Sequence, residues 1–326
     1  MPLNVCMVGY GMMGVWHSEA LRRTDAVLHT LVGRRPDATE EFAARYGYRK
    51  WTTSLDAALA DPDVDVVVLA SPSEYHEEQA IACLNAGKHT LIEIPIALTL
   101  EGAERVVAAG EASGKVYGLC HPMRFRRERV ALHARLQAGE EHLRHFAGRF
   151  FIHRLENVGA TGYRRSWTDN ILWHHFCHFV DLGLFLADFA PVTRVQSHLG
   201  LPHATTGVPM ECTVLAETSA DQTVLVHGSY HSSFRLYDEL IVTDRDTYFF
   251  DSAAGTLRTG AGTVPTENEQ ANCALVIEDF LAAVRDGRKP LADGPSVLPA
   301  MRVLQAAQDD WDTRHGARDL PGRPLD

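Results

Sequence analysis

Near its start the chain reads Leu3-Asn4-Val5-Cys6-Met7-Val8 and then Gly9-Tyr10-Gly11-Met12-Met13-Gly14. The first run is short and apolar, as expected of a buried strand, and a helical pattern follows the glycines as far as Leu21. Glycines spaced in this way between a strand and a helix permit a tight turn and let the backbone approach a pyrophosphate at the helix N-terminus. The stretch therefore predicts a Rossmann dinucleotide-binding fold, in which the cofactor-binding residues are Gly9, Gly11, Met12, Met13 and Gly14. The alternative is a glycine-rich turn that binds no ligand.

The second apolar run, residues 27–32, ends in Gly33-Arg34-Arg35. NAD sites usually place an acidic residue here, about 20 residues past the glycines, to bind the ribose 2′-hydroxyl. This chain has two arginines instead, whose charge and planar donors suit a 2′-phosphate. We therefore predict NADP as the cofactor, with NAD still possible, and Arg34 and Arg35 as binding residues. The alternative is that both arginines belong to a solvated turn.

The alternation of strand and helix continues through the first third of the chain. Apolar strands are expected at residues 65–70, 90–95 and 116–120, with helices at 74–86 and 98–112. Continuous apolar runs are typical of strands buried on both faces in a parallel sheet. Residues 1–120 are thus predicted to form a doubly wound parallel sheet whose ligands bind beyond the carboxyl ends of the strands.

From about residue 143 the pattern changes to successive strands separated by Gly, Pro and Asp turns. Strands are expected at 143–154, 192–199, 210–217, 222–230, 236–242 and 247–250, and helices at 171–188, 270–285 and 296–311. Consecutive strands at such spacing indicate a mostly antiparallel sheet. We therefore predict an α/β chain in which residues 121–326 form an α+β substrate-binding domain with a large open sheet.

The composition limits the class of partner. The 326 residues carry a formal charge of −11 and no Lys/Arg block long enough to follow a phosphate backbone, which argues against nucleic acid. The N-terminus leads into a strand without a basic leader or a long apolar segment, so we expect no export signal and no membrane contact. The six cysteines are scattered singly in apolar runs, which predicts buried free thiols and a cytoplasmic, reducing location.

Three histidines crowd the apolar stretch Trp173-His174-His175-Phe176-Cys177-His178-Phe179-Val180-Asp181. In a helix that advances about 100° per residue, His174, His178 and Asp181 lie within roughly 60° of one another. Imidazoles on one face could transfer protons or, with the carboxylate, hold a metal ion. Histidine and aspartate side chains also occur beneath a helix as buried polar groups whose hydrogen bonds are made within the protein. That alternative stays open.

Several short motifs together resemble the glucose–fructose oxidoreductase/inositol dehydrogenase/MocA (Gfo/Idh/MocA) family. They are the glycine motif with His17, Ser71-Pro72 with His76, the run from Asn85 to His89, and Glu93-Ile94-Pro95. The resemblance implies a nicotinamide-dependent dehydrogenase, commonly a homodimer or homotetramer, with cofactor contacts at Ser71, Pro72, His76, Glu93 and Pro95. The family usually has Lys where this chain has Ile94, so its proton-transfer group must come from elsewhere.

The histidine stretch departs from the family as well, because His174 stands at the position of the family's Asp. Residues 93–97 and 165–175 resemble a narrower branch, the 4-carboxy-2-hydroxymuconate-6-semialdehyde dehydrogenases of aromatic-acid breakdown. This branch uses NADP to oxidise the cyclic hemiacetal of that semialdehyde to 2-pyrone-4,6-dicarboxylate. The resemblance makes His178 the first candidate for the general base and His174 the second. Asp181 is either a helper that fixes the imidazole tautomer or a structural anchor.

A small carboxylated substrate needs cationic partners. Arg124, Arg164 and Arg165 are the candidates, and Trp167 and His175 are further substrate-binding residues. Members of this branch have an Arg at the position of Met123 and an Arg pair after the Phe-Phe that corresponds to Phe150-Phe151, so we expect a reduced or rearranged carboxylate-binding set. A sugar or inositol dehydrogenase of the same family, a metal enzyme, and a regulator that binds NADP without turnover remain alternatives, although hydride transfer itself needs no metal.

Overall fold

The structure is a computed structural model that describes residues 2–156, 158, 162 and 170–316, and it divides into two compact units. The first unit comprises residues 2–122 together with Gln270–Val297. The second contains residues 123–156, 170–269 and 298–316. The boundary near residue 122 lies close to the predicted one, but the segment Gln270–Val297, which we predicted to belong to the second domain, is part of the first unit.

The first unit is built on a six-stranded parallel sheet of order β3-β2-β1-β4-β5-β6. Its strands are β1 (Asn4–Val8), β2 (Val27–Val32), β3 (Lys50–Thr52), β4 (Val66–Leu69), β5 (His89–Ile92) and β6 (Tyr117–Leu119). The central strands β1 and β4 are buried along almost their whole length, as a sheet covered on both faces requires. The predicted doubly wound fold is confirmed.

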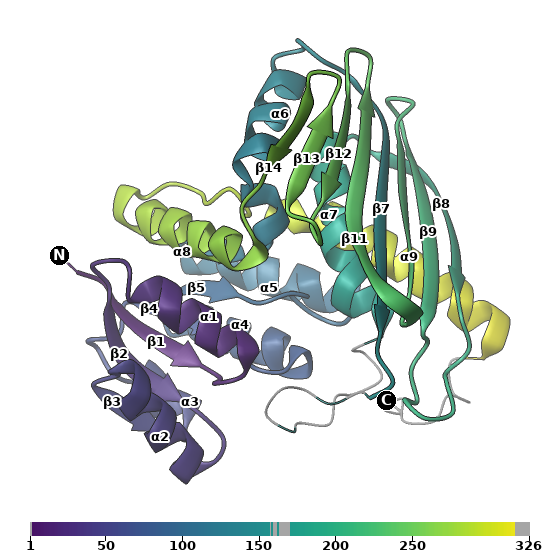
Figure 1. The fold of residues 1–326 in the computed structure, drawn as a ribbon. Helices are drawn as coiled ribbons and strands as arrows, with labels where there is room; N and C mark the ends of the chain where they lie inside the picture. Colours follow the sequence, from purple (N-terminus) through teal and green to yellow (C-terminus); the bar gives the residue numbers. More distant parts are fainter. Residues whose placement is uncertain (1, 157, 159–161, 163–169, 317–326) are drawn as a thin grey trace. The chain divides into compact units, whose positions relative to one another are not determined.

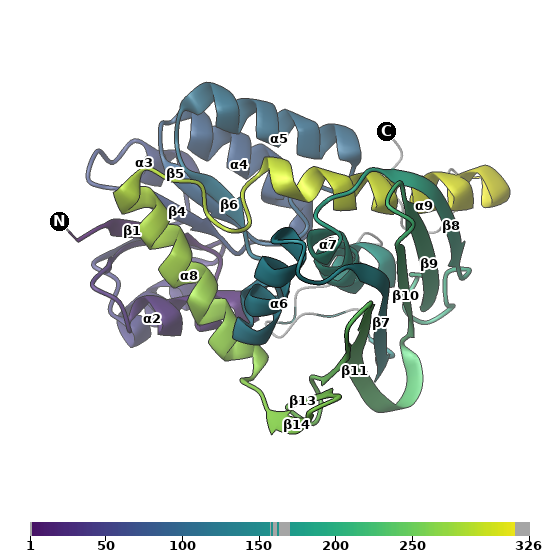
Figure 2. The same cartoon turned by 90° about the horizontal axis from the view of Figure 1, so that it is seen from above.

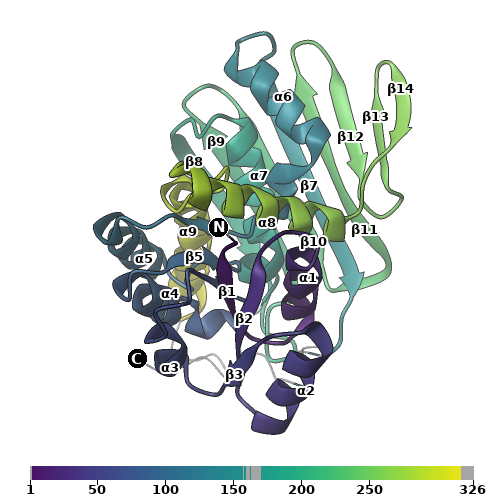
Figure 3. The ribbon, with the colours of Figure 1, turned by 90° about the vertical axis from the view of Figure 1, so that its left-hand side faces the viewer.

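Helices connect these strands and lie on both faces of the sheet. Figure 3 shows α1 and α2 on one side and α4 and α5 on the other. The helices are α1 (Met12–Leu21), α2 (Pro36–Tyr46), α3 (Leu55–Leu59), α4 (His76–Asn85) and α5 (Leu100–Ser113), with a 3₁₀ turn η1 (Ser73–Tyr75) before α4. Local sequence sets their ends: Thr99 Oγ1 accepts a hydrogen bond from Gly102 N at the start of α5, and Gly114 ends that helix with φ +64°.

Helix α8 (Glu269–Asp286) and the segment after it complete the first unit. Leu119 N in β6 donates to Ala292 O at 2.8 Å, and Arg285 forms an ion pair with Asp25. These contacts join residues far apart in the sequence. The hydrophobic periodicity of residues 270–297 therefore could not show that the segment belongs to the unit that contains the parallel sheet.

The second unit is an eight-stranded sheet of order β14-β13-β12-β11-β7-β10-β9-β8 (Figure 1). Every neighbouring pair is antiparallel except β7 and β10, which run parallel. The strands are β7 (Leu143–His153), β8 (Val192–Leu199), β9 (Glu211–Thr218), β10 (Thr223–Ser229), β11 (His231–Thr243), β12 (Thr247–Asp251), β13 (Thr256–Thr259) and β14 (Gly262–Pro265). Buried and less buried residues alternate along β9 and β10, so one face of the sheet is packed.

The packed face carries helices, which Figure 2 shows on one side of the strands. They are α6 (Arg127–Gln137), which follows the turn η2 (Pro122–Phe125), then α7 (Cys177–Leu186) and α9 (Leu298–His315), which follows the turn η5 (Pro295–Val297). Helix α7 packs closely, because a Cβ at Gly183 would lie 2.5 Å from the Val224 side chain of β10. The predicted large, mostly antiparallel sheet is confirmed. None of the described helices is long and apolar enough to span a bilayer.

Candidate functional site

The glycine motif lies at the carboxyl end of β1, where a dinucleotide is expected. Gly9 has φ +103°, and a Cβ there would lie 2.4 Å from Ala70 O, so only glycine fits this turn. A Cβ at Gly14 would lie 2.6 Å from Gly9 O, whereas one at Gly11 would meet no atom within 4 Å. The loop is therefore packed at its first and third glycines and open at the second, which is the geometry that admits a pyrophosphate.

Helix α1 begins at this loop without a capping side chain. Its N-cap is Gly11, and Met12 and Met13 open the helix with no acidic residue in the first turn. The amide N–H groups of a first helical turn have no intrahelical acceptor and favour an anion. The residues present therefore fit the phosphates of a nicotinamide dinucleotide.

The arginine pair follows β2 at the same edge of the sheet. Both Arg34 and Arg35 are exposed, and Arg35 is the N-cap residue of α2, where its carbonyl accepts from Thr39 N at 2.9 Å. The backbone at Arg35 is thus fixed by the helix while its side chain extends into solvent. Rossmann folds contact the ribose 2′ position of a dinucleotide from residues at this place in the chain.

Other predicted cofactor residues organise the loops after β4 and β5. His76 is buried, with Nδ1 lying 2.7 Å from Pro95 O and Nε2 lying 2.9 Å from Ser71 O. Ser71 Oγ donates to Gln79 Oε1 at 2.6 Å. Pro72 is the N-cap residue of the turn η1. The imidazole of His76 therefore links the loop after β4 to the loop after β5.

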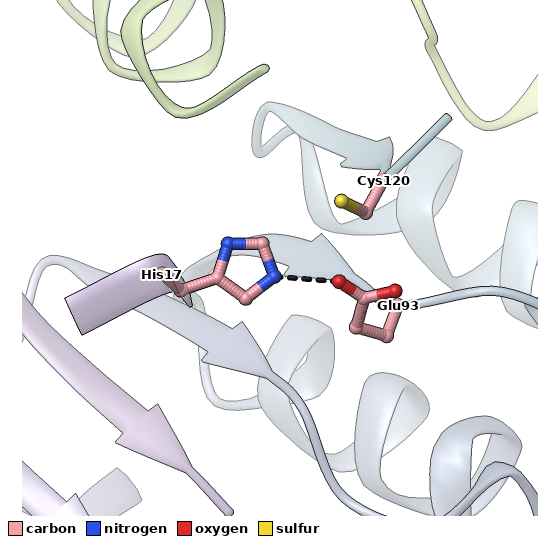
Figure 4. Close-up of side chains that lie close together, drawn as sticks. All are labelled: His17, Glu93 and Cys120. Atoms are coloured by element: carbon pink, nitrogen blue, oxygen red, sulfur yellow. Dashed lines mark hydrogen bonds and ion pairs between the residues drawn. The ribbon is translucent and has the colours of Figure 1, made fainter. Parts of the chain in front are cut away.

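Glu93 points toward His17 of helix α1, as Figure 4 shows. His17 Nε2 and Glu93 Oε1 are 2.6 Å apart, and both side chains are buried. His17 was part of the family resemblance but was not among the predicted site residues. The pair links the glycine-motif helix to the Glu-Ile-Pro loop.

The thiol of Cys120 lies beside this pair, and the three ligand atoms are within 4.8 Å of one another (Figure 4). Contact with the Cys273 thiol, burial and the charge of Glu93 all raise the pKa of the Cys120 thiol well above its ordinary value. Metal binding requires the thiolate, so a metal ion here would have to displace a firmly held proton and the His17–Glu93 hydrogen bond. The geometry describes a hydrogen-bonded pair next to a neutral thiol.

In the second unit the histidine stretch is not a regular α-helix. Residues Leu172–Phe176 form a single π-helical turn, η4, before α7 begins at Cys177. Asn170 Oδ1 starts it by accepting from the backbone N–H groups of Leu172 and Trp173. The wider turn advances less than 100° per residue, so the angles of an ideal α-helix do not apply to His174 within it. Single π turns are often found at functional sites.

Asp181 has a structural partner, the guanidinium of Arg124. Arg124 Nε donates to Asp181 Oδ2 at 2.7 Å, and a second short contact joins Nη2 to Oδ1. The exposed fractions are 0% for Arg124 and 1% for Asp181. Burial raises the pKa of Asp181, and the charges of Arg124 and His178 act against this rise. Arg124 lies between two aromatic rings, each 5.2 Å from its guanidinium carbon, and this buried pair favours the anchor alternative for Asp181.

Arg124 was expected to bind a substrate carboxylate, and its position is different. Both of the contacts above engage the guanidinium with Asp181 inside the unit. We therefore no longer propose Arg124 as a substrate ligand. The other predicted cations, Arg164 and Arg165, and Trp167 beside them, lie outside the described residues.

His175 has a well-defined environment. Its ring stacks on Phe150 of β7 with a centroid separation of 4.0 Å, and its Nδ1 lies 2.6 Å from the hydroxyl of Tyr230. The ring of His174 stands edge-on to it at 4.4 Å. His174 and His178 are both partly exposed, as proton transfer to a ligand requires. No sequence pattern indicated Tyr230, which lies 55 residues after His175.

Comparison with known proteins agrees with this geometry. Residues 3–121 match the family model described as "Oxidoreductase family, NAD-binding Rossmann fold", the GFO_IDH_MocA model, and residues 128–255 match "Bacterial oxidoreductases, C-terminal". The chain is 31% identical over 311 residues to 4-carboxy-2-hydroxymuconate-6-semialdehyde dehydrogenase of a Sphingobium species, which covers 93% of this chain and 96% of that protein.

Sugar and inositol dehydrogenases are similar over a smaller part or in fold. Myo-inositol 2-dehydrogenase of Thermotoga maritima is 31% identical over 106 residues, 32% of each chain. The solved structure of levoglucosan dehydrogenase with NADH and levoglucosan superposes with a TM-score of 0.86 at 18% identity, covering 96% of this chain and 98% of that one. This last likeness shows the fold alone.

Proposed function

Because this chain belongs to the Gfo/Idh/MocA family of oxidoreductases, and is thus an NAD(P)-dependent dehydrogenase, we propose that it oxidises a carboxylated semialdehyde. The proposed reaction converts the cyclic hemiacetal of 4-carboxy-2-hydroxymuconate-6-semialdehyde to 2-pyrone-4,6-dicarboxylate in the catabolism of aromatic compounds. The observation that carries this proposal is the extent of the similarity. The relative with this activity matches both units, whereas the inositol dehydrogenase matches about a third of the chain.

Oxidation of a hemiacetal removes a hydride from carbon and a proton from oxygen. The nicotinamide, when bound, accepts the hydride. Ile94 occupies the place of the family's Lys, and its buried aliphatic side chain cannot accept a proton. We assign that task to His178, with His174 as the second candidate, because a neutral imidazole is the ordinary proton acceptor near neutral pH. Asp181 forms a buried ion pair with Arg124, so we assign it the structural role of holding helix α7 in place.

We further propose NADP as the preferred cofactor. The exposed side chains of Arg34 and Arg35 support this choice, because two guanidiniums can bind a 2′-phosphate through charge and paired hydrogen bonds. The first-turn amides of α1 and the open face at Gly11 would hold the pyrophosphate. We also propose that the enzyme acts in the cytoplasm as a homodimer or homotetramer, as its family commonly does.

The test is product formation by the purified enzyme. The semialdehyde and NADP⁺ should yield NADPH and 2-pyrone-4,6-dicarboxylate in equal amounts, measured by NADPH absorbance and by mass spectrometry of the product. Levoglucosan and myo-inositol serve as parallel substrates. Turnover of either neutral polyol without turnover of the semialdehyde would replace the proposed function with that of a sugar or inositol dehydrogenase.

A further inference from the structure

We propose that His17 is a positioning residue for hydride transfer, which couples the two nucleotide-binding halves of the parallel sheet by holding the carboxylate of Glu93. The inference concerns the step that all NAD(P)-dependent dehydrogenases share, so it goes beyond the proposed substrate and does not depend on it. Both residues lie in the first unit.

The two halves of the sheet can be assigned from its strand order. A doubly wound sheet binds a dinucleotide across the point where the strand order reverses, with one nucleotide to each half. Here β1–β3 form one half and β4–β6 the other. The glycine motif and the arginine pair belong to the first half, which is therefore expected to bind the pyrophosphate and the adenosine ribose. The nicotinamide is then expected beyond the carboxyl ends of β4–β6, where Glu93 directly follows β5.

His17 belongs to α1 of the first half, and its imidazole reaches the carboxylate at the start of the loop after β5 (Figure 4). Nε2 lies 2.6 Å from Glu93 Oε1, and Glu93 Oε2 accepts a hydrogen bond from Ile94 N at 3.2 Å. The Glu93 backbone is held as well, because its N–H donates to Leu69 O at 2.9 Å. One carboxylate thus connects the glycine-motif helix to the backbone of the loop in the second half.

Packing alone does not favour histidine at position 17. The side chain has no exposed surface, and its Nδ1 atom is buried without a hydrogen-bond partner among the described residues. A buried polar atom without a partner costs free energy that an apolar side chain of similar size would avoid. Hydrogen bonds to carboxylates are stronger than those between neutral groups. The contact with Glu93 is therefore the interaction that a histidine adds at this position.

The loop that Glu93 begins is also held at its other end. His76 Nδ1 lies 2.7 Å from Pro95 O, so the loop has hydrogen bonds on both sides of Ile94. A nicotinamide bound beyond β5 would meet this loop, and hydride transfer is sensitive to small displacements of the reacting atoms. The hydrogen bond between His17 and Glu93 therefore sets the position of the nicotinamide rather than the affinity of the adenosine half.

The experiment compares two amide substitutions that differ in reach. His17→Gln can bring an N–H donor close to the position of the imidazole Nε2, whereas the side chain in His17→Asn is one methylene shorter. Two ligands are titrated by calorimetry: NADPH, and 2′-phospho-ADP-ribose, which lacks the nicotinamide. If the parent enzyme prefers NAD, NADH and ADP-ribose replace them. Steady-state kinetics with the substrate that the parent oxidises give kcat.

The two ligands and kcat should respond differently in the Asn variant. Its kcat should fall about 10–100-fold, the effect of losing one hydrogen bond to a carboxylate, and the Kd of NADPH should rise several-fold. The Kd of 2′-phospho-ADP-ribose should stay near the parental value, because this ligand lacks the ring that meets the loop. The Gln variant should recover most of both losses. A purely structural role of His17 would instead weaken both ligands alike, since α1 itself would be disturbed.

The matched control is His29→Asn. His29 is also buried in the first unit, but its Nδ1 lies 2.9 Å from Oγ1 of the adjacent Thr30, so this hydrogen bond stays within β2. The variant controls for the loss of a buried imidazole from the parallel-sheet unit. Its kcat and both Kd values should equal those of the parent enzyme.

Two results would overturn the inference. One is a parental kcat and a parental NADPH affinity in His17→Asn, and the other is an equal weakening of NADPH and of the ligand without nicotinamide. If the Asn variant does not fold, His17→Leu is measured in its place under the same criteria.

The outcome is distinguishable from failure of the proposed function, because the titrations need no substrate. If the parent binds NADPH but oxidises only a neutral polyol, the proposed substrate is wrong. The role of His17 is then decided by the same titrations, with kcat measured on that polyol.

Discussion

The buried pair of Arg124 and Asp181 should stabilise the second unit rather than take part in proton transfer. The substitution Asp181→Asn keeps the size of the side chain but leaves the Arg124 charge in the interior without its counter-ion. Arg124 has no exposed surface, and its flat faces meet Phe185 and Phe189, so water cannot replace the lost carboxylate. Removing one partner of such a pair costs about 3–5 kcal/mol of unfolding free energy. That loss is a large share of the roughly 5–15 kcal/mol by which domains are stable.

The assay is urea unfolding followed by circular dichroism, on Asp181→Asn, Arg124→Met and the double variant. Each single substitution should lower the unfolding free energy by the amount above. The double variant should lose less than the sum of the two, because the coupling between contacting charged groups is about 0.5–3 kcal/mol. Below its unfolding transition, Asp181→Asn should retain a kcat close to that of the parent enzyme.

The opposite pattern would give Asp181 a part in proton transfer. If Asp181→Asn lowers the unfolding free energy by less than about 1 kcal/mol, within the range of an ordinary hydrogen bond, and also reduces kcat strongly, the carboxylate acts on the histidines. Asp181 would then belong to the proton-transfer group, as our first alternative held.

Three further predictions concern the general base, the preferred cofactor and the pH dependence of stability. His178→Asn should lower kcat about 10²–10⁴-fold and leave NADPH affinity unchanged, whereas an unaffected kcat, with His174→Asn impaired instead, would move the base to His174. Replacing Arg34 with Asp and Arg35 with Ser should shift the ratio of kcat/KM values from NADP toward NAD; an unchanged ratio would reject the 2′-phosphate assignment. Burial, reinforced by the charge of Arg124, lowers the pKa of His133, so the folded state should lose stability as pH falls from about 6.5 through that lower pKa. His133→Phe should flatten that part of the pH dependence of the urea midpoint, and an equally steep dependence in the variant would contradict it.

The Rossmann unit could be predicted because its signals are local. The glycine spacing, the apolar runs of β1 and β4 and the strand Val27–Val32 each specify structure within a few residues. Helix α2 and strand β3 were not predicted, since β3 has three residues, of which two are exposed, and α2 buries only a narrow stripe. Both lie near the surface, where hydrophobic periodicity is weak.

Helix α6 shows a different reason for a missed element. Its buried residues are Arg129, Leu132 and His133, so charged and polar side chains occupy the positions that should be apolar. Arg129 is buried because Glu239, 110 residues away in sequence, provides its counter-ion. Such pairing depends on the tertiary fold, and no sequence window contains both partners.

The candidate site was predicted in its residue types but not in its contacts. The histidines near α7 were recognised as chemically unusual, but the π turn before Cys177 was not predicted, because the apolar pattern of the stretch does not distinguish it from an α-helix. Arg124 was recognised as a cation near the end of a strand, but its partner Asp181 lies 57 residues further on. Tyr230 joins the histidines where β10 passes into β11, through a contact with His175 that spans 55 residues of sequence and that consecutive strand patterns do not predict.

The most direct test of the central claim is a competition between substrates. The enzyme is supplied with NADP⁺ and equal concentrations of the semialdehyde, levoglucosan and myo-inositol, and the products are separated and quantified over the initial phase. We expect 2-pyrone-4,6-dicarboxylate to form in amounts equal to the NADPH, with little oxidation of the two neutral polyols. Preferential oxidation of either polyol would contradict the claim that this chain is a dehydrogenase of a carboxylated semialdehyde.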